Sequence, residues 1–500
     1  MRLSVLDLVV IAAYFLSMVG IGLYFSRRQT SRDEYYLAGR EMHWLLVGAS
    51  VLATLLSTIT YLSIPGEMIR YGIMFFAGTI AIPLAVPVVS KLIIPTITRM
   101  PITSAYQYLE KRYGNETRRL AGGVFLAHTL VWTGLIFYTA SLAVGQVAGW
   151  DLLPTILIMG VVTIFYTSMG GIRTVIWTDN VQLLILFGGA ISIPIYVAVV
   201  TGAGPSAWWE NFSQAGGSQI TFFSWDPTVR LTVVGVIVNI FMWEMCTHSS
   251  DQVAVQRYLS TPSVKAARNS MAAYAVFRVL LGLFLALCGL AVFAFYQQQS
   301  GLDPNAFQAQ ITQQADRLMP HFIAEQLSGG VAGLLLAALL AAAMSSLSSA
   351  INSAAGVLRS DFLPAGKTDR MIVDKLLVVG GGIIGMMIAV TVNYAMQRLN
   401  WNLVEMTGRL NHIFVGPLAA LFFAGVLSKR VSQPAVLVGF VAGGLLSLYI
   451  CFSTVSFMWV VPGSWTCAFL TSLLISRFTQ PAPVTRVAGL TYGSLRAERR

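Results

Sequence analysis

Apolar residues fill this chain in long blocks that are separated by short polar connections. The blocks are roughly 20 to 30 residues long, which is close to what one helix needs to cross about 30 Å of hydrocarbon. About thirteen can be marked, and no stretch between them is long enough for a separate soluble domain. The pattern predicts an all-α, polytopic membrane protein with a single transmembrane domain over residues 1–477. The predicted spans are 4–25, 43–71, 74–98, 118–149, 152–170, 174–200, 230–258, 266–297, 328–360, 372–396, 401–427, 432–453 and 455–476.

Composition and charge agree with this picture. Hydrophobic residues make up 56% of the chain and charged residues only 11%, whereas about a quarter of the residues of a soluble protein are charged. The net charge of +11 is explained by the orientation of the chain in the membrane. With an external N-terminus, most of the 32 Lys and Arg residues, Arg257 among them, fall in inner connections, as the positive-inside rule requires.

The charge distribution also bears on partners and location. No connection joins a basic stripe to interleaved aromatic residues, so nucleic acid is not an expected partner. We predict a multi-pass protein of the cell (plasma) membrane, embedded in the lipid bilayer, with the N-terminus outside and the C-terminus in the cytoplasm. The tail at 478–500 contains Pro481 and Pro483 and is expected to be cytoplasmic and disordered.

Two of the predicted spans are interrupted by polar residues. The second contains LSTITYLSIPGE, in which Ser57, Thr60 and Pro65 follow one another closely, so its backbone is expected to unwind where it is sheltered from lipid. A simple proline kink is the alternative. The seventh contains Asp251 and Gln252, which favour a functional site facing a cavity. The alternative is that both reach headgroups at the cytoplasmic end.

The two interrupted spans lie five spans apart. This spacing is typical of a secondary transporter built from two inverted repeats, here residues 43–200 and 230–427, with accessory helices at 432–476. The chain has no GxxxxGK[ST] motif for a nucleotide. An ion gradient is therefore the expected source of energy.

The ninth span and the sixth span carry candidate cation ligands. Neutral hydroxyl oxygens on one helical face suit sodium, although small residues also serve tight helix packing in membranes. Asp179 in the sixth span is either a second cation ligand or a carboxylate that pairs with a nearby arginine. The ninth-span candidates are Ala342, Ser345, Ser346, Ser348, Ser349 and Ser353.

Several longer motifs occur in order along the chain. They include EYYLAGREMHW, LATLLSTITYLSIPGEMIRYG, ITSAYQYLEKRYG, YTSMGGIRTVIWTDNVQ, DQVAVQRYLST and AAAMSSLSSAINSAAGVLRSD. Through them the chain resembles the sodium:solute symporters, the group of sodium/glucose, proline, iodide, multivitamin, monocarboxylate and sialic acid transporters. The resemblance extends to about Ser428. It implies a LeuT-like five-plus-five inverted repeat with one helix before the core and two after it.

The resemblance also implies ion ligands. The common sodium site of the family would use the carbonyl oxygens of Ala53, Leu56 and Ala342 and the hydroxyl groups of Ser345 and Ser346. Members with a second sodium site place an aspartate against hydroxyl groups of the serine span. The matching residues here are Asp179, Ser345, Ser348 and Ser349.

The solute is less well defined by the resemblance. The LSTIT pattern is most similar to the bacterial sialic acid branch, in which Ser57 and Thr60 would line the substrate cavity. That branch holds the carboxylate of the sugar with an arginine in the third core helix, where this chain has Val131 and Trp132. The candidate substrate-binding residues are Ser57, Thr60, Trp132, Asp251 and Gln252.

We therefore expect a symporter that imports a small polar organic solute, such as a sugar, sugar acid or carboxylate, by alternating access. Sodium is the expected co-substrate, with two sites, and no organic cofactor or enzymatic activity is expected. A proton-coupled symporter with Asp179 or Glu244 as carrier and a non-transporting membrane sensor are the alternatives. The sequence does not assign the solute, the number of sodium ions per cycle (one or two), the oligomeric state or the roles of His128, Glu244, Arg278, Glu405 and Arg409.

Overall fold

The computed structural model describes residues 4–27, 31–217, 219–312, 315–327, 329–363, 371–396 and 411–497. These residues form helices and connections. The chain up to the first long outer connection forms α1 (Val5–Ser26), α2 (Arg32–Leu37), η1 (Ala38–Arg40), α3 (Trp44–Leu55), α4 (Thr58–Tyr71), α5 (Ile73–Phe76), η2 (Ala77–Ile80), α6 (Ala81–Val88), η3 (Val89–Ile93), α7 (Ile94–Ile97), α8 (Tyr106–Arg112), α9 (Asn115–Ala148), α10 (Leu152–Thr201) and α11 (Pro205–Gln214).

The rest of the chain also consists mainly of long helices joined by short connections. It forms α12 (Val233–Ser250), α13 (Gln252–Leu259), α14 (Val264–Ser300), α15 (Pro304–Ile311), α16 (Ala315–Glu325), α17 (Val331–Val357), η5 (Leu358–Phe362), α18 (Met371–Met396), α20 (Val415–Leu427), α21 (Gln433–Phe452), η6 (Phe457–Trp459), α22 (Val460–Ile475), η7 (Val484–Arg486) and α23 (Tyr492–Ala497).

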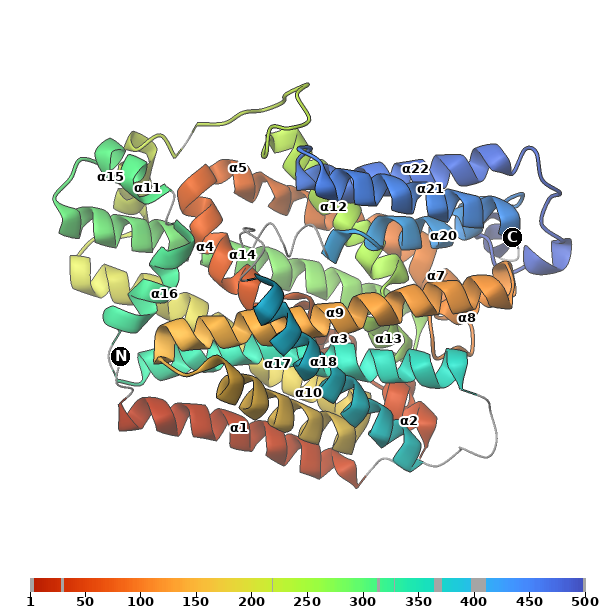
Figure 1. Ribbon diagram of the computed structural model, residues 1–500, viewed down its shortest axis with the longest axis horizontal. Coiled ribbons are helices and arrows are strands. Elements are labelled where there is room, and N and C mark those ends of the chain that lie inside the picture. Colours follow the sequence, from red (N-terminus) through yellow and green to blue (C-terminus); the bar gives the residue numbers. More distant parts are fainter. Residues whose placement is uncertain are drawn as a thin grey trace.

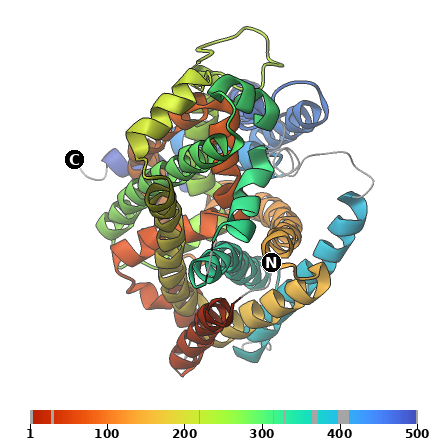
Figure 2. The ribbon, with the colours of Figure 1, turned by 90° about the vertical axis from the view of Figure 1, so that its left-hand side faces the viewer.

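The long helices run side by side in a bundle around α17. Figure 1 shows α1 at one edge of the bundle and α21 and α22 at the opposite edge, and Figure 2, viewed along the bundle, shows the same separation. Helix α17 contacts α10, α9 and α1, and nearly all of its residues are buried. The serine-bearing helix therefore lies within the protein and does not face lipid.

Nine helices within the described residues are long and apolar enough to cross a membrane, and a tenth span is formed if α3 and α4 are counted as one broken helix. Helix α20 is shorter, and the predicted span 401–427 is described only from residue 411. The all-helical class is confirmed, whereas the count of thirteen spans stays a prediction.

The fifth and sixth predicted spans are joined in α10, with a break at Gly171. The backbone there has φ 56° and ψ −156°, a conformation that is accessible to glycine but not to residues with a Cβ atom. A Cβ atom at this position would also lie 2.4 Å from the carbonyl oxygen of Tyr35. Gly171 thus permits both the change of direction and the close contact with α2.

The expectation of a disordered tail is wrong for residues 478–497. Leu490 and Leu495 are buried, and the hydroxyl group of Tyr108 in α8 donates a hydrogen bond to the Leu490 carbonyl oxygen at 3.2 Å. Arg486 donates another to the carbonyl oxygen of Tyr113. The prolines suggested disorder, but these apolar side chains and backbone contacts hold the tail against the bundle.

Candidate functional site

The first candidate site begins at the break between α3 and α4. The two helices meet at 73°, and Leu56 between them has an extended backbone with φ −92° and ψ 106°. Ser57 caps the second helix by accepting a hydrogen bond from the Thr60 amide. Because the last carbonyl groups of a helix have no partner within it, the break leaves oxygens of α3 free to bind other groups.

These free carbonyl oxygens meet the serines of α17. The Ser345 hydroxyl lies 2.7 Å from the Ala53 carbonyl oxygen and 3.1 Å from that of Ala342. The Ser346 hydroxyl lies 3.4 Å from the Leu56 carbonyl oxygen and 3.2 Å from that of Ala342. The structure thus brings together all five residues that the family resemblance indicates.

One further oxygen completes this group. The Ser346 hydroxyl donates to the Thr54 carbonyl oxygen at 2.7 Å, a contact that the sequence pattern did not indicate. We call these six residues the serine–carbonyl cluster. All of its serine side chains are buried, and it contains only uncharged oxygens, which suit a hard monovalent cation. The cluster consists of Ala53, Thr54, Leu56, Ala342, Ser345 and Ser346.

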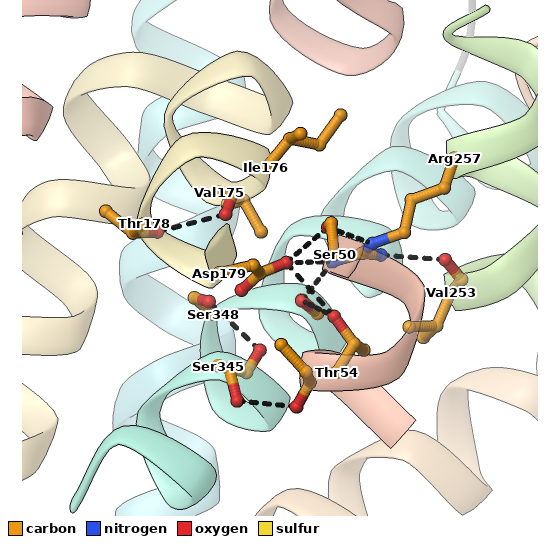
Figure 3. Close-up of polar contacts among 12 residues, drawn as sticks. Ser50, Thr54, Val175, Ile176, Thr178, Asp179, Val253, Arg257, Ser345 and Ser348 are labelled. Carbon is orange, nitrogen blue, oxygen red and sulfur yellow. Dashed lines mark hydrogen bonds and ion pairs between the residues drawn. The ribbon is translucent and has the colours of Figure 1, made fainter. Parts of the chain in front are cut away.

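Asp179 of α10 lies in a second, charged group of residues. One of its carboxylate oxygens, Oδ2, accepts hydrogen bonds from Ser50 and from Thr54, the latter at 3.2 Å. The same oxygen lies 2.9 Å from the Arg257 guanidinium. Figure 3 shows Asp179 facing Ser50 and Thr54 of α3, with Arg257 reaching in from α13.

The serines of α17 join this group from the other side. Ser349 accepts a hydrogen bond from Arg257 and lies 2.8 Å from the Thr54 hydroxyl, while Ser348 donates to the Ser345 carbonyl oxygen at 3.1 Å. Asp179 and Arg257 are both fully buried. We call Ser50, Thr54, Asp179, Arg257 and Ser349 the Asp179 cluster.

Arg257 does not lie in an inner connection, as its position in the sequence suggested. It lies in α13 with no exposed surface and pairs with Asp179. The pairing matches the alternative expectation for Asp179. Its other carboxylate oxygen, Oδ1, has no hydrogen-bond partner among the described residues, so one acceptor remains for a further cation.

The second predicted break is present between α12 and α13. Asp251 separates the two helices with φ −78° and ψ 119°, and its carboxylate accepts a hydrogen bond from the Val253 amide at 2.8 Å. Asp251 also lines a small pocket that includes His128, Trp132 and Ser346. Asp251 therefore shares this pocket with one serine of the serine–carbonyl cluster and with residues of α9.

Gln252 is placed differently from what we expected of a substrate-binding residue. Its side-chain oxygen accepts a hydrogen bond from the Ala105 amide at 2.7 Å, and its nitrogen donates to the Thr103 carbonyl oxygen at 2.9 Å. Both ends of the amide are occupied by the backbone before α8. Neither Gln252 nor Asp251 lines the larger pocket that contains Ser57, Thr60 and Trp132.

A polar cavity with a volume of about 240 Å³ lies within the bundle, and we call it the central cavity. Its walls combine hydroxyl groups, two tryptophans and charged groups from α4, α9, α12 and α14. The lining includes Ser57, Thr60 and Trp132, which the sequence predicted as substrate-binding residues. It also includes Glu244 and Arg278, to which the sequence assigned no role. Such a mixture of aromatic surface and a few polar groups is typical of small-molecule sites.

Glu244 is held by a buried hydrogen-bond network. Its Oε2 atom accepts a hydrogen bond from the Tyr274 hydroxyl at 2.7 Å and lies 3.1 Å from His248 Nε2. The Tyr258 hydroxyl lies 2.6 Å from the other ring nitrogen of His248. His128 pairs with Asn411 at 2.8 Å. Glu405 and Arg409 lie outside the described residues.

Two broken helices beside a polar cavity inside a helical bundle are typical of a secondary transporter. Comparison with known proteins specifies the family. Residues 35–443 match the sodium:solute symporter family, and the chain belongs to it. The family and its relatives are symporters rather than enzymes, as the sequence indicated.

The curated relatives carry different solutes. The chain is 31% identical over 443 residues to the sodium/sialic acid symporter SiaT of Proteus mirabilis, covering 86% of each chain. It is 31% identical over 464 residues to human sodium-coupled monocarboxylate transporter 1, covering 89% of this chain and 73% of that one. With the rabbit sodium-dependent multivitamin transporter it shares 29% identity over an alignment of 518 positions, which covers 98% of this chain and 79% of the relative.

Solved structures agree on the fold. A substrate-bound, outward-open Na⁺-coupled sialic acid symporter superposes with a TM-score of 0.85 at 27% identity, covering 96% of this chain and 99% of that one. Mhp1, a nucleobase-cation-symport-1 family transporter, gives a TM-score of 0.59 at 13% identity, over 91% and 97% of the two chains. The fold is that of the LeuT-like transporters, as the sequence predicted.

Proposed function

We propose that this symporter imports a small polar organic solute together with sodium, and that the serine–carbonyl cluster binds the coupling ion. The proposal rests mainly on one observation. The Ser345 and Ser346 hydroxyls of α17 lie within hydrogen-bond distance of carbonyl oxygens that the α3–α4 break has freed. A sodium ion there would join α3 to α17 and fix the break next to Ser57, which lines the central cavity.

A second sodium ion is proposed at Asp179, Ser345, Ser348 and Ser349. The Asp179 Oδ1 atom supports it, because it has no hydrogen-bond partner in the part of the chain that the structure describes, while Arg257 already neutralises the other carboxylate oxygen. A sodium ion at this site would share the Asp179 carboxylate with the Arg257 guanidinium. The affinity for sodium would then depend on how far the guanidinium moves away from Asp179. Each sodium ion that moves inward gains about 2.3 kcal/mol per 100 mV of membrane potential.

The remaining proposals concern location and solute. We propose a cell (plasma) membrane protein with the N-terminus outside and the C-terminus in the cytoplasm, surrounded by the lipid bilayer and without a nucleic-acid partner. The solute is proposed to contact Ser57, Thr60 and Trp132 in the central cavity. Because relatives carry sialic acid and monocarboxylates, sialic acid and L-lactate are the first probes for uptake.

The test is uptake into proteoliposomes with an inward sodium gradient. We expect choline in place of sodium, at fixed pH, to abolish accumulation, whereas a proton-coupled carrier would keep it. Ser346→Ala removes a hydroxyl ligand and is expected to raise the sodium concentration for half-maximal uptake at least about tenfold, the equivalent of 1.4 kcal/mol.

The matched control for this variant is Ser472→Ala. Ser472 is also buried, but its hydroxyl donates only to the Ala468 carbonyl oxygen of its own helix, α22, at 2.7 Å. This variant should keep the sodium dependence of the wild type. Equal sodium dependence in the Ser346→Ala and Ser472→Ala proteins would contradict the proposed ion site.

A further inference from the structure

Arg278 of α14 differs from the other arginines that lie within the bundle. Arg257 pairs with Asp179, and Arg118 pairs with Asp361 at 2.8 Å. Arg278 lines the central cavity and is partly exposed there, yet no hydrogen bond or ion pair joins it to any described residue. Intramembrane charges are normally paired or face water, so this guanidinium is available to a bound molecule.

The two acidic residues in the cavity lining make their hydrogen bonds and ion pairs with groups other than Arg278, although the Glu244 carboxylate attracts the guanidinium through space. Glu244 is bound by Tyr274 and His248, and it makes no ion pair with Arg278. Glu67, the other acid in the lining, lies 2.8 Å from the Arg230 guanidinium. Neither acid therefore occupies the N–H groups of Arg278 among the described residues.

The surroundings of Arg278 leave room for a ligand. Gly282, one helical turn further along α14, also lines the cavity, and a Cβ atom there would lie 3.9 Å from Arg278 Nη1. The missing side chain opens the space beside the guanidinium. Across the cavity, Ser57 and Thr60 offer hydroxyl groups and Trp132 offers an aromatic face.

We propose that Arg278 binds the carboxylate of the transported solute, so that the protein selects organic acids over their neutral counterparts. This inference rests on the proposed function, because it assigns the central cavity to the solute. A guanidinium presents two parallel N–H groups that match the two oxygens of a carboxylate. The hydroxyl groups and the tryptophan in the same lining then bind the remainder of the molecule.

The experiment compares acids with amides of the same shape. Binding of N-acetylneuraminate, D-glucuronate and L-lactate to purified wild-type protein is measured by calorimetry in sodium chloride, each beside the analogue with an amide in place of the carboxylate. We expect at least one acid to bind at least tenfold more tightly than its amide. Amides that bind as tightly as the acids, or a panel in which no acid binds, would overturn the proposal.

Two variants of Arg278 test whether this residue causes the preference for the acid over the amide. Arg278→Gln is expected to lower the affinity for the acid at least tenfold and to leave the affinity for the amide unchanged, whereas Arg278→Lys keeps part of the preference for the acid. Arg173→Gln is the matched control, since Arg173 pairs with Glu34 at 2.6 Å and both residues lie outside the cavity lining; it should keep the wild-type ratio. A wild-type ratio in both Arg278 variants would overturn the assignment.

A separate measurement distinguishes failure of this inference from failure of the proposed function. Stabilisation by sodium chloride relative to choline chloride, without solute, reports the ion site alone. We expect Arg278→Gln to retain this stabilisation in full. Absence of any sodium effect in the wild type would refute the ion site, whereas an unchanged acid-to-amide ratio in Arg278→Gln would refute only the role of Arg278.

Discussion

The ion pair between Asp179 and Arg257 allows the charged cluster to be tested quantitatively. The Asp179 Oδ2 atom and the Arg257 guanidinium are 2.9 Å apart, and both side chains are fully buried. We consider the single variants Asp179→Asn and Arg257→Gln and the double variant that combines them. Each single change leaves one charge inside the bundle without its partner.

The magnitude follows from the geometry. At 2.9 Å and an effective dielectric constant of about 20, two unit charges attract one another by roughly 6 kcal/mol. Desolvation of both groups offsets much of this attraction in the intact pair. Loss of one partner is expected to cost about 3–5 kcal/mol, because it leaves an uncompensated buried charge. The double variant leaves no charge and should be less damaging than the sum of the two single changes.

The assay is reversible unfolding of the purified protein in mixed micelles with increasing denaturing detergent. We expect a coupling free energy above about 2 kcal/mol from the double-mutant cycle. The control cycle uses Arg173 and Glu34, which approach to 2.6 Å but are both partly exposed; its coupling should be at most about 1 kcal/mol. Additive single variants, within about 0.5 kcal/mol, would refute the reasoning.

Two other predictions concern the frame around the sites. Gly171→Ala is expected to lower stability by about 1–3 kcal/mol, because its Cβ atom would meet Tyr35; Gly202→Ala, with a similar φ of 67° but open surroundings, should cost less in the same thermal unfolding assay. Gln252→Ala removes two hydrogen bonds to the backbone and should lower stability by about 1–3 kcal/mol. Its solute affinity should match the wild type, and a selective loss of solute binding would restore Gln252 to the binding site.

The helix breaks could be predicted from sequence because they violate a simple physical rule. Hydroxyl groups and Pro65 in one apolar block, and Asp251 in another, have no place on a lipid-facing helix. The serine pattern of α17 likewise places Ser345 and Ser346 on adjacent faces that point inward. These signals are local, so they can be read without knowledge of the packing.

The partner of Asp179 could not be predicted in this way. Arg257 lies near many basic residues in the sequence, and a count of positive charges per connection treats it like any other. Its burial follows from the packing of α13 against α3, where Arg257 donates a hydrogen bond to the Ser50 hydroxyl. The role of Arg278 could not be predicted either, because a lone charge in an apolar block indicates only that its surroundings are polar.

The segment from Ser50 to Ser57 connects all three candidate sites. Ser50 and Thr54 bind Asp179, the Ala53 and Leu56 carbonyl oxygens meet the serines of α17, and Ser57 lines the central cavity. An ion that orders this segment reduces the entropy that a solute must lose when it binds next to it. Coupling between ion and solute therefore needs no large movement at either site, because both act on the conformation of the same broken helix.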